Sequence, residues 1–346
     1  MKINNILNFT KASTLSVGIA ICVAVSAPIY AAELKVQVQS DFGQLDPAFW
    51  ASQADRNIIH AIYPKLIEFK SSKTWEWQLS SAESIEQIDD LTIKFTLKPG
   101  LMWTNGYGEV TAEDVEYSFE RFTNEDLAAP NAGDWSPLKD VEVLDKYSGL
   151  IHLKEPFAPI WWSTLPYTGG AILSKKAMEE MGGKFTTDPK VTAGPYKIES
   201  WDQGQRTILV AHDGWNGVAP AFDRLELIPI NDPKLAEVAF QAGQVDITQV
   251  AISSVPSMQA SLTDDELLEV RPSADYFWLG LKAENPDLKD ARVREAIKKA
   301  IDVEAIIEGA YFGIPERSTG LVAPGLIGHR EEAQPARDVA GARGRR

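Results

Sequence analysis

The sequence predicts an α/β protein with mixed α+β sheets, arranged in two domains or in three small ones. Segments that alternate apolar and polar residues are interleaved with segments whose apolar residues recur at helical spacing, and their order has no fixed repeat. The length of 346 residues fits that number of domains. Hydrophobic residues make up 44% and charged residues 24% of the chain, as in globular proteins, so fibrous and disordered classes are excluded for most of it.

The first predicted elements after residue 32 are a strand and a helix. Residues 34–39 (LKVQVQ) alternate apolar and polar, which is the period of a half-buried strand. Residues 56–69 carry isoleucines and a leucine at helical spacing, although Pro64 interrupts the pattern. We therefore expect a helix over this range.

A second strand and helix follow. Residues 91–97 (LTIKFTL) alternate cleanly and end at the turn signal Pro99-Gly100. Residues 111–122 predict a helix because Thr111 and Asp114 resemble a capping box and apolar residues then line one face.

Later segments continue the mixture. We expect a strand pair within 141–153, a hairpin of 195–201 with 206–211, a strand at 225–230 and a helix at 234–242 that ends at a glycine. Residues 290–301 form an amphipathic pattern, and Asp302 is placed to cap a second helix through residue 307.

Residues 1–32 have the three parts of a secretory signal peptide. Two lysines precede an apolar run at 15–27, and Ala31 and Ala32 supply the small residues of a cleavage site. An uncleaved anchor is the alternative, but the apolar run is short for a membrane span. Cys22, the single cysteine, lies inside the run without the small neighbours of a lipid-attachment site. We expect cleavage near Ala31 or Ala32 and export to an oxidising compartment.

Composition and motifs exclude several function classes. The 34 basic against 49 acidic residues, a net charge of −15, argue against nucleic-acid binding. One cysteine excludes a disulfide framework or a multi-cysteine zinc site. The sequence has no GxxxxGK[ST], GxSxG, HExxH or CxxC motif, and its four histidines are scattered singly. Two facing carboxylates would leave no sequence signature, so an exported hydrolase of peptides or oligosaccharides stays open as an alternative.

Six motifs then occur in order. They are LDP at 45–47, LTIKFTLKPG at 91–100 with WTNG at 103–106, TAEDV at 111–115, GPY at 194–196, AGQVD at 242–246 and DARVREAIKKAID at 290–302. Together they resemble the family 5 extracellular solute-binding proteins of ABC importers, the dipeptide-, oligopeptide- and nickel-binding type. The resemblance runs from about residue 34 to residue 328. Most of these residues make sense as turn, cap and packing residues, so the motifs record fold more than chemistry.

The resemblance implies a periplasmic-binding-protein type II-like fold of two lobes that close over a ligand. It divides the chain into a signal peptide (1–32), a lobe I body (33–55 and 185–265), a small companion domain of lobe I (56–184), the hinge crossing with the start of lobe II (266–328) and a disordered tail (329–346). Family members are longer, so we expect the second lobe to be incomplete. A truncated fragment of the receptor that binds no ligand is therefore an alternative to a working binding protein.

The implied function is capture of a peptide or similar small solute in the periplasm and its delivery to the membrane permease of an ABC importer. The resemblance also implies a monomer that binds no nucleic acid. It implies no metal, no cofactor and no catalytic residue. Opines, oligosaccharides and metal chelates are also ligands in this family, and a chemosensing role is a further alternative.

The resemblance also indicates ligand-contacting positions. They are Trp50, Ser52 and Gln53 after the LDP motif, Asn131 and Trp135 after the TAEDV helix, Thr192 before GPY, and Tyr276 and Trp278 near the hinge. Large aromatic side chains on loops often line ligand sites, but most of the ten tryptophans should be core residues. Loop packing or hinge support is an equally good interpretation of each of the eight positions.

Overall fold

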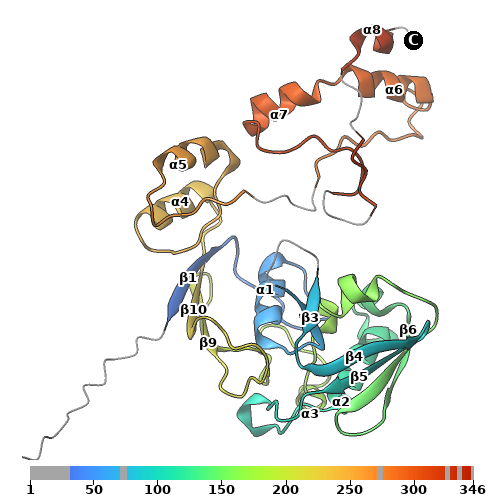
Figure 1. Ribbon diagram of the computed structural model, residues 1–346, viewed down its shortest axis with the longest axis vertical. Helices are drawn as coiled ribbons and strands as arrows, with labels where there is room; N and C mark the ends of the chain where they lie inside the picture. Colours follow the sequence, from blue (N-terminus) through green and yellow to red (C-terminus); the bar gives the residue numbers. More distant parts are fainter. Residues whose placement is uncertain (1–31, 71–75, 271–275, 324–327, 333–336, 344–346) are drawn as a thin grey trace, which may run out of the picture. The chain divides into compact units, whose positions relative to one another are not determined.

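The computed structural model describes residues 32–70, 76–270, 276–323, 328–332 and 337–343, and within them it has the predicted mixed α/β composition (Figure 1). The strands lie in two four-stranded sheets and one two-stranded ribbon. The signal peptide predicted at 1–32 lies, but for its last residue, outside the described residues. None of the described helices is long and apolar enough to cross a bilayer.

The first sheet joins strands from the two ends of residues 33–229. Its order is β1 (Glu33–Val38), β10 (Arg224–Pro229), β9 (Arg206–Ala211) and β8 (Tyr196–Asp202). β1 runs parallel to β10, with Leu34 opposite Leu225, whereas the other pairs are antiparallel. The predicted strand at 34–39 and the predicted hairpin are therefore confirmed, and long-range pairing brings them together.

The second sheet is wholly antiparallel. Its order is β4 (Ala82–Asp89), β5 (Thr92–Leu97), β7 (Ser148–Leu153) and β6 (Leu138–Val143). The alternation in β5 buries Ile93, Phe95 and Leu97 and leaves Lys94 exposed. Helix α2 (Ala112–Glu120) packs against β6 and contributes Phe119 to the same core. The sequence pattern predicted this face correctly.

Helix α1 (Gln53–Ile62) is shorter than predicted. Tyr63, which precedes Pro64, is extended with φ −113° and ψ 141°, because a proline ring disfavours helical geometry in the residue before it. The segment expected to continue the helix instead becomes β2 (Ile67–Phe69), paired with β3 (Trp77–Leu79). The prediction of one helix to residue 69 was wrong.

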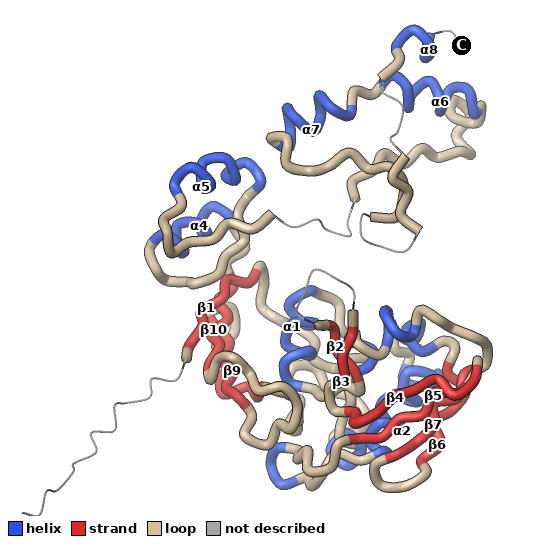
Figure 2. The backbone as a smooth tube through the Cα atoms, viewed as in Figure 1, coloured by secondary structure: helices blue, strands red, loops and turns tan. Residues whose placement is uncertain are grey.

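Beyond β10 the regular elements of the described chain are helices, joined by long loops, as Figure 2 shows. The helices there are α4 (Pro233–Gln241), α5 (Val255–Ser261), α6 (Ala291–Ala300), α7 (Val303–Tyr311) and α8 (Val339–Arg343). Shorter helices elsewhere are α3 (Lys175–Glu180), a π-turn at Ile160–Thr164 and 3₁₀ turns at Thr104–Gly106, Arg121–Thr123, Glu125–Leu127, Ala132–Trp135, Thr168–Gly170 and Ile252–Ser254.

The tail expected to be disordered contains α8. The Asp338 backbone N–H donates to the Lys299 carbonyl at 2.9 Å, and the Asp338 carboxylate lies 3.3 Å from the Lys299 ammonium. These two contacts hold the start of α8 to α6. The composition of the tail did not predict this helix, because the residue that holds it, Lys299, is about forty residues away in the sequence.

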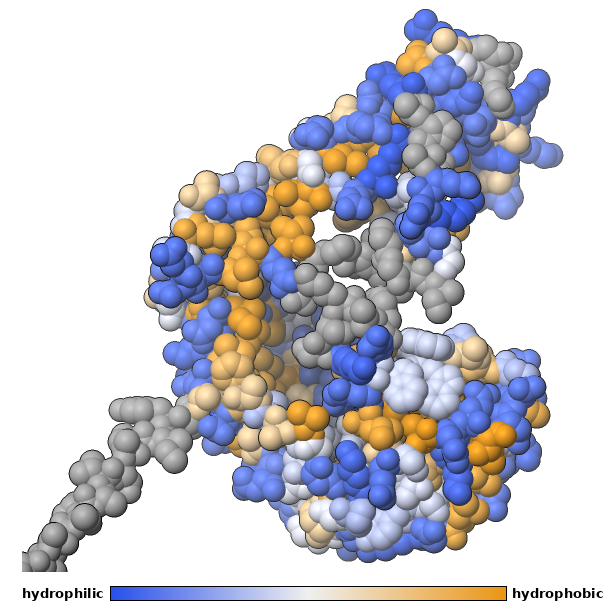
Figure 3. Space-filling model, in the orientation of Figure 1, coloured by the Kyte–Doolittle hydropathy of each residue, from blue (hydrophilic) through white to orange (hydrophobic). Residues whose placement is uncertain are grey.

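Large apolar side chains remain exposed on the helical part. Leu235 and Val238 on α4 and Leu267 in the following coil are among them. In Figure 3 the apolar colour gathers over β1, β10, α4 and α5. In the sheet of β4 to β7, in contrast, Ile93, Phe95, Val141 and Ile151 are buried in a core.

Candidate functional site

The segment that follows the LDP motif is anchored by the start of α1. Ser52 caps the helix: its hydroxyl accepts a hydrogen bond from the Asp55 N–H at 3.1 Å, and the Ser52 N–H donates to the Asp55 carboxylate at 2.9 Å. The Asp55 carboxylate also accepts hydrogen bonds from the N–H groups of Gly43 and Gln44. Ser52, predicted to contact ligand, therefore has a positioning role in the structure.

Arg56 lies one turn into the helix and contacts two aromatic rings. Its guanidinium carbon is 5.0 Å from the Trp50 ring centre and 5.2 Å from the Tyr167 ring centre. The Arg56 Nη2 donates to the Gln53 side-chain oxygen, and the Asn131 Nδ2 donates to the Trp50 carbonyl at 3.0 Å. We call Trp50, Gln53, Arg56, Asn131 and Tyr167 the Arg56 cluster.

The cluster unites three predicted residues with two that sequence reasoning missed. Trp50, Gln53 and Asn131 were expected at a ligand site, and the structure brings them together. Arg56 could have been noticed because it follows Gln53 by three residues on the same helix face. Tyr167 is more than a hundred residues from Arg56, and no local pattern marks it.

Tyr167 is held in place by the chain beside it. The Lys65 ammonium donates to the Pro166 carbonyl at 3.2 Å, and Lys65 forms an antiparallel bridge with Ala171. The Ile172 N–H donates to the Pro64 carbonyl at 2.9 Å. These bonds fix the 166–172 segment next to the end of α1 and therefore set where the Tyr167 ring lies.

The electrostatic environment beside the cluster is positive. Burial, assisted by the charges of Lys65 and Arg56, lowers the pKa of His60 to about 3. Burial also lowers the pKa of Lys65 to about 8, so this lysine is still mostly charged at neutral pH. The neutral His60 ring packs edge-on against Tyr167, and its Nε2 lies 3.2 Å from the Thr168 hydroxyl.

Two buried donors in the cluster lack a partner. The Trp50 Nε1 and the Arg56 Nε have no hydrogen-bond partner among the described residues. A buried N–H group without an acceptor loses the hydrogen bonds that it makes to water in the unfolded chain. Such groups are therefore more typical of binding sites than of a fully satisfied core.

Trp135 and Thr192 are buried in the core, which favours packing, the other interpretation of these positions, and leaves their contact with ligand a prediction. The Trp135 side chain has no exposed surface, its ring stacks on Phe119 at 4.2 Å, and its Nε1 donates to the Gly169 carbonyl at 2.8 Å. Thr192 is buried, and its backbone exchanges two hydrogen bonds with Thr104. Both side chains therefore contribute to packing in this structure.

Tyr276 and Trp278 lie in exposed coil after residues 271–275, which are not described. Their side chains are 44% and 74% exposed. Between them, Phe277 lies 5.5 Å from the Tyr311 ring. Both residues are accessible, and their contact with ligand stays a prediction.

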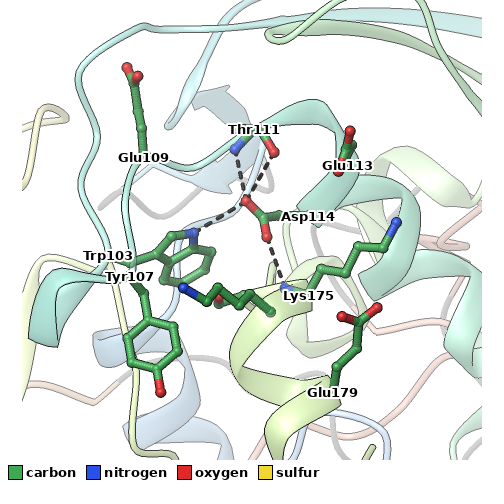
Figure 4. Close-up of a pocket in the computed structure, with 10 residues that line it drawn as sticks. Trp103, Tyr107, Glu109, Thr111, Glu113, Asp114, Lys175 and Glu179 are labelled. Carbon is green, nitrogen blue, oxygen red and sulfur yellow. Dashed lines mark hydrogen bonds between the residues drawn. The ribbon is translucent and has the colours of Figure 1, made fainter.

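A cavity of about 260 Å³ lies elsewhere in the chain, between the start of α2 and α3 (Figure 4). Burial raises the pKa of the central Asp114. Its carboxylate accepts hydrogen bonds from the Trp103 Nε1, the Thr111 N–H and the Lys175 N–H. Asp114 therefore links the WTNG motif, the α2 cap and the start of α3. The residue at the centre of this cavity has a structural role. Within the described residues, no group of three or more His, Cys, Asp or Glu side chains is placed to hold a metal ion.

The sequence was also compared with known protein families. Residues 76–344 match the model of the bacterial extracellular solute-binding proteins, family 5. The chain belongs to this family. The family resemblance and the fold that it implied are therefore confirmed.

Similar curated relatives of this family 5 protein are binding proteins. The glutathione-binding protein GsiB of Salmonella paratyphi A is 26% identical over 92% of this chain and 62% of its own length. The probable D,D-dipeptide-binding periplasmic protein DdpA of Escherichia coli K12 is 25% identical over 82% of this chain and 56% of its own length. The chain thus spans about three-fifths of the relatives that it matches.

Several similar solved structures contain bound ligands, and two of them illustrate the range. MoaA from A. tumefaciens R10, in complex with mannopinic acid, is 27% identical with a TM-score of 0.70 and covers 80% of this chain and 57% of its own. The oligopeptide-binding protein AppA of Bacillus subtilis, in complex with a nonapeptide, is 23% identical with a TM-score of 0.75 and covers 90% of this chain and 63% of its own. The AppA comparison supports the fold alone.

Proposed function

We propose that this family 5 protein captures a peptide or similar small solute in the periplasm and delivers it to the permease of an ABC importer. Family membership supports a binding role, and the relatives are named for binding glutathione or D,D-dipeptides. As part of the proposal, the lobe I body (33–55 and 185–265) and its companion domain (56–184) present one side of the ligand site, and residues 266–328 cross toward the second lobe.

The observation that carries the proposal is the composition of the Arg56 cluster. It combines two aromatic rings, a guanidinium, a carboxamide and an indole N–H that has no acceptor among the described residues. Flat apolar faces with a few fixed polar groups are what small-molecule binding sites offer. The groups suit a small polar organic solute such as a peptide.

The residues beside the Arg56 cluster give little support to hydrolysis. A hydroxyl–imidazole pair does occur, between Thr168 and His60. Thr168 is fully buried, however, and a His60 whose pKa is about 3 is too weak a base to activate a hydroxyl near neutral pH. We therefore propose that the protein binds its solute without changing it.

The test is incubation of the full chain with a tripeptide library, followed by native mass spectrometry. Retained intact peptides support solute capture, and cleaved peptides support the hydrolase alternative. Trp50→Ala should reduce retention, because it removes one of the two faces beside Arg56. Trp162→Ala is the matched control, since Trp162 is 44% exposed and lies outside the Arg56 cluster. Equal loss in both variants would contradict the site.

A further inference from the structure

We propose that Arg56 receives a carboxylate group of the bound solute. This inference rests on the proposed function and names the chemical class of the solute: an organic acid, such as a peptide with a free C-terminus. Four features of the described residues carry it.

The first feature is that Arg56 has no carboxylate of its own. Among the described residues, its guanidinium has one hydrogen-bond partner, the side-chain oxygen of Gln53, and no ion-pair partner. Arg121 and Arg292, in contrast, meet Asp46 and Asp290. A half-buried guanidinium normally has such a partner, because burial of an unpaired charge is costly.

The second feature is that the nearest carboxylate on the same helix is fully engaged elsewhere. One Asp55 oxygen accepts hydrogen bonds from Gly43 and Gln44, and the other accepts hydrogen bonds from Ala51 and Ser52. These four backbone N–H groups leave Asp55 no free direction toward Arg56. The charge of Arg56 therefore stays available to a ligand.

The third feature is that two aromatic rings hold the guanidinium in position. The rings of Trp50 and Tyr167 lie 5.0 and 5.2 Å from its central carbon, so two cation–π contacts restrict its movement. A guanidinium is planar and presents its N–H groups as a fork, which matches the two oxygens of a carboxylate. The arrangement is formed before a ligand arrives, so little conformational entropy is lost on binding.

The fourth feature is the set of unmet donors. The Trp50 Nε1 and the Arg56 Nε are both buried without an acceptor in the described chain, and they belong to the two residues in cation–π contact. An anionic oxygen that settled against this contact would supply the missing acceptor. One available guanidinium matches a singly charged carboxylate better than a phosphate, because the other cation nearby, Lys65, is buried and bound to Pro166.

The test is an NMR titration of the ¹⁵N-labelled full chain that follows the Nε–Hε signal of Arg56. The probes are sodium propionate and propionamide, which differ in charge but hardly in size. We expect propionate to shift the Arg56 signal in a saturable way and propionamide to leave it in place. The signal of Arg292, whose guanidinium already meets Asp290, should move with neither probe. Arg56→Lys assigns the signal by removing it.

An Arg56 signal that ignores propionate, or that moves equally with propionamide, overturns the inference. A second measurement separates it from the proposed function: retention of a tripeptide library with free C-termini against the same library with C-terminal amides. Wild-type protein should prefer the free acids by about tenfold or more, the effect of one lost hydrogen bond to a charged group. Arg56→Gln should lose this preference, whereas Arg292→Gln should keep it. Equal retention of both libraries leaves solute capture standing and refutes the carboxylate contact. If neither library is retained but propionate still shifts the Arg56 signal, peptide capture is refuted and the carboxylate contact stands.

Discussion

Arg121 donates two hydrogen bonds to Asp46, from Nη1 at 2.6 Å and from Nη2 at 2.8 Å, and both side chains are almost fully buried. Arg121 Nη2 also donates to the Gly183 carbonyl at 2.8 Å, and Asp46 accepts a hydrogen bond from the Ala48 N–H at 3.0 Å. The pair therefore ties the LDP motif to the end of helix α2. It fixes the backbone that leads to Trp50 and the Arg56 cluster.

Asp46→Asn should destabilise the protein by about 3–5 kcal/mol, because it leaves the Arg121 charge buried without its counter-ion. Urea unfolding followed by circular dichroism measures the change. Asp202→Asn is the control, since the ion pair of Asp202 with Arg206 is exposed and should contribute less than about 1 kcal/mol. Similar losses in the two variants would show that the buried Arg121–Asp46 pair contributes no more to the free energy of unfolding than an exposed pair.

Gly194→Ala should cost about 1–3 kcal/mol through overpacking. A Cβ atom at Gly194 would lie 2.4 Å from the Ile62 carbonyl carbon and 2.6 Å from the Tyr63 nitrogen, so the GPY loop and the end of α1 would have to separate. Gly133→Ala is the control, because its Cβ would meet nothing within 4 Å. Thermal unfolding of both variants checks the prediction, and an unchanged midpoint for Gly194→Ala would contradict this close approach.

The stability of the protein should decrease as the pH falls below about 6.5, in part because of His60. Burial and the charges of Lys65 and Arg56 lower the pKa of His60 from 6.5 to about 3. Between these values the unfolded chain binds a proton that the native state does not bind. The group therefore stabilises the fold above pH 6.5, and this contribution is lost as the pH falls toward 3, by at most about 1.4 kcal/mol per pH unit.

The His60 contribution is isolated by comparison with His60→Gln, whose amide can still bond to Thr168. Urea unfolding at about pH 7.5 and about pH 5 should show a smaller pH-dependent loss for the variant than for the wild type. Carboxylates that titrate in the same range affect both proteins equally. Identical losses would mean that His60 titrates normally in the folded protein.

The two tryptophans predicted near the ligand should behave differently on truncation. Trp135→Ala should destabilise the protein by about 3–5 kcal/mol, because it empties a fully buried site against Phe119. Trp50→Ala should cost about 1 kcal/mol, mainly the contact with Arg56. Denaturant unfolding of both variants measures the difference. A larger loss of stability for Trp50→Ala than for Trp135→Ala would contradict the prediction.

Sequence reasoning succeeded wherever the decisive interactions are local. The alternation in β5, the cap formed by Thr111 and Asp114, and the helix that begins after Asp302 each depend on residues within a few positions of one another. It failed where a distant partner decided the outcome. The alanine- and arginine-rich tail forms α8 through contacts with Lys299, and Trp135 is a core residue because Phe119 and Gly169 surround it.

The sequence by itself determined the family and the order of the elements, because motif spacing and short-range periodicity are properties of the sequence. It also predicted a site in the segment after LDP. Only the tertiary structure decided which side chains share that site. Arg56 and Tyr167 meet because the bridge between Lys65 and Ala171 brings two distant segments together. Long-range packing is a property of the folded chain, and no local pattern encodes that a guanidinium will contact two particular rings.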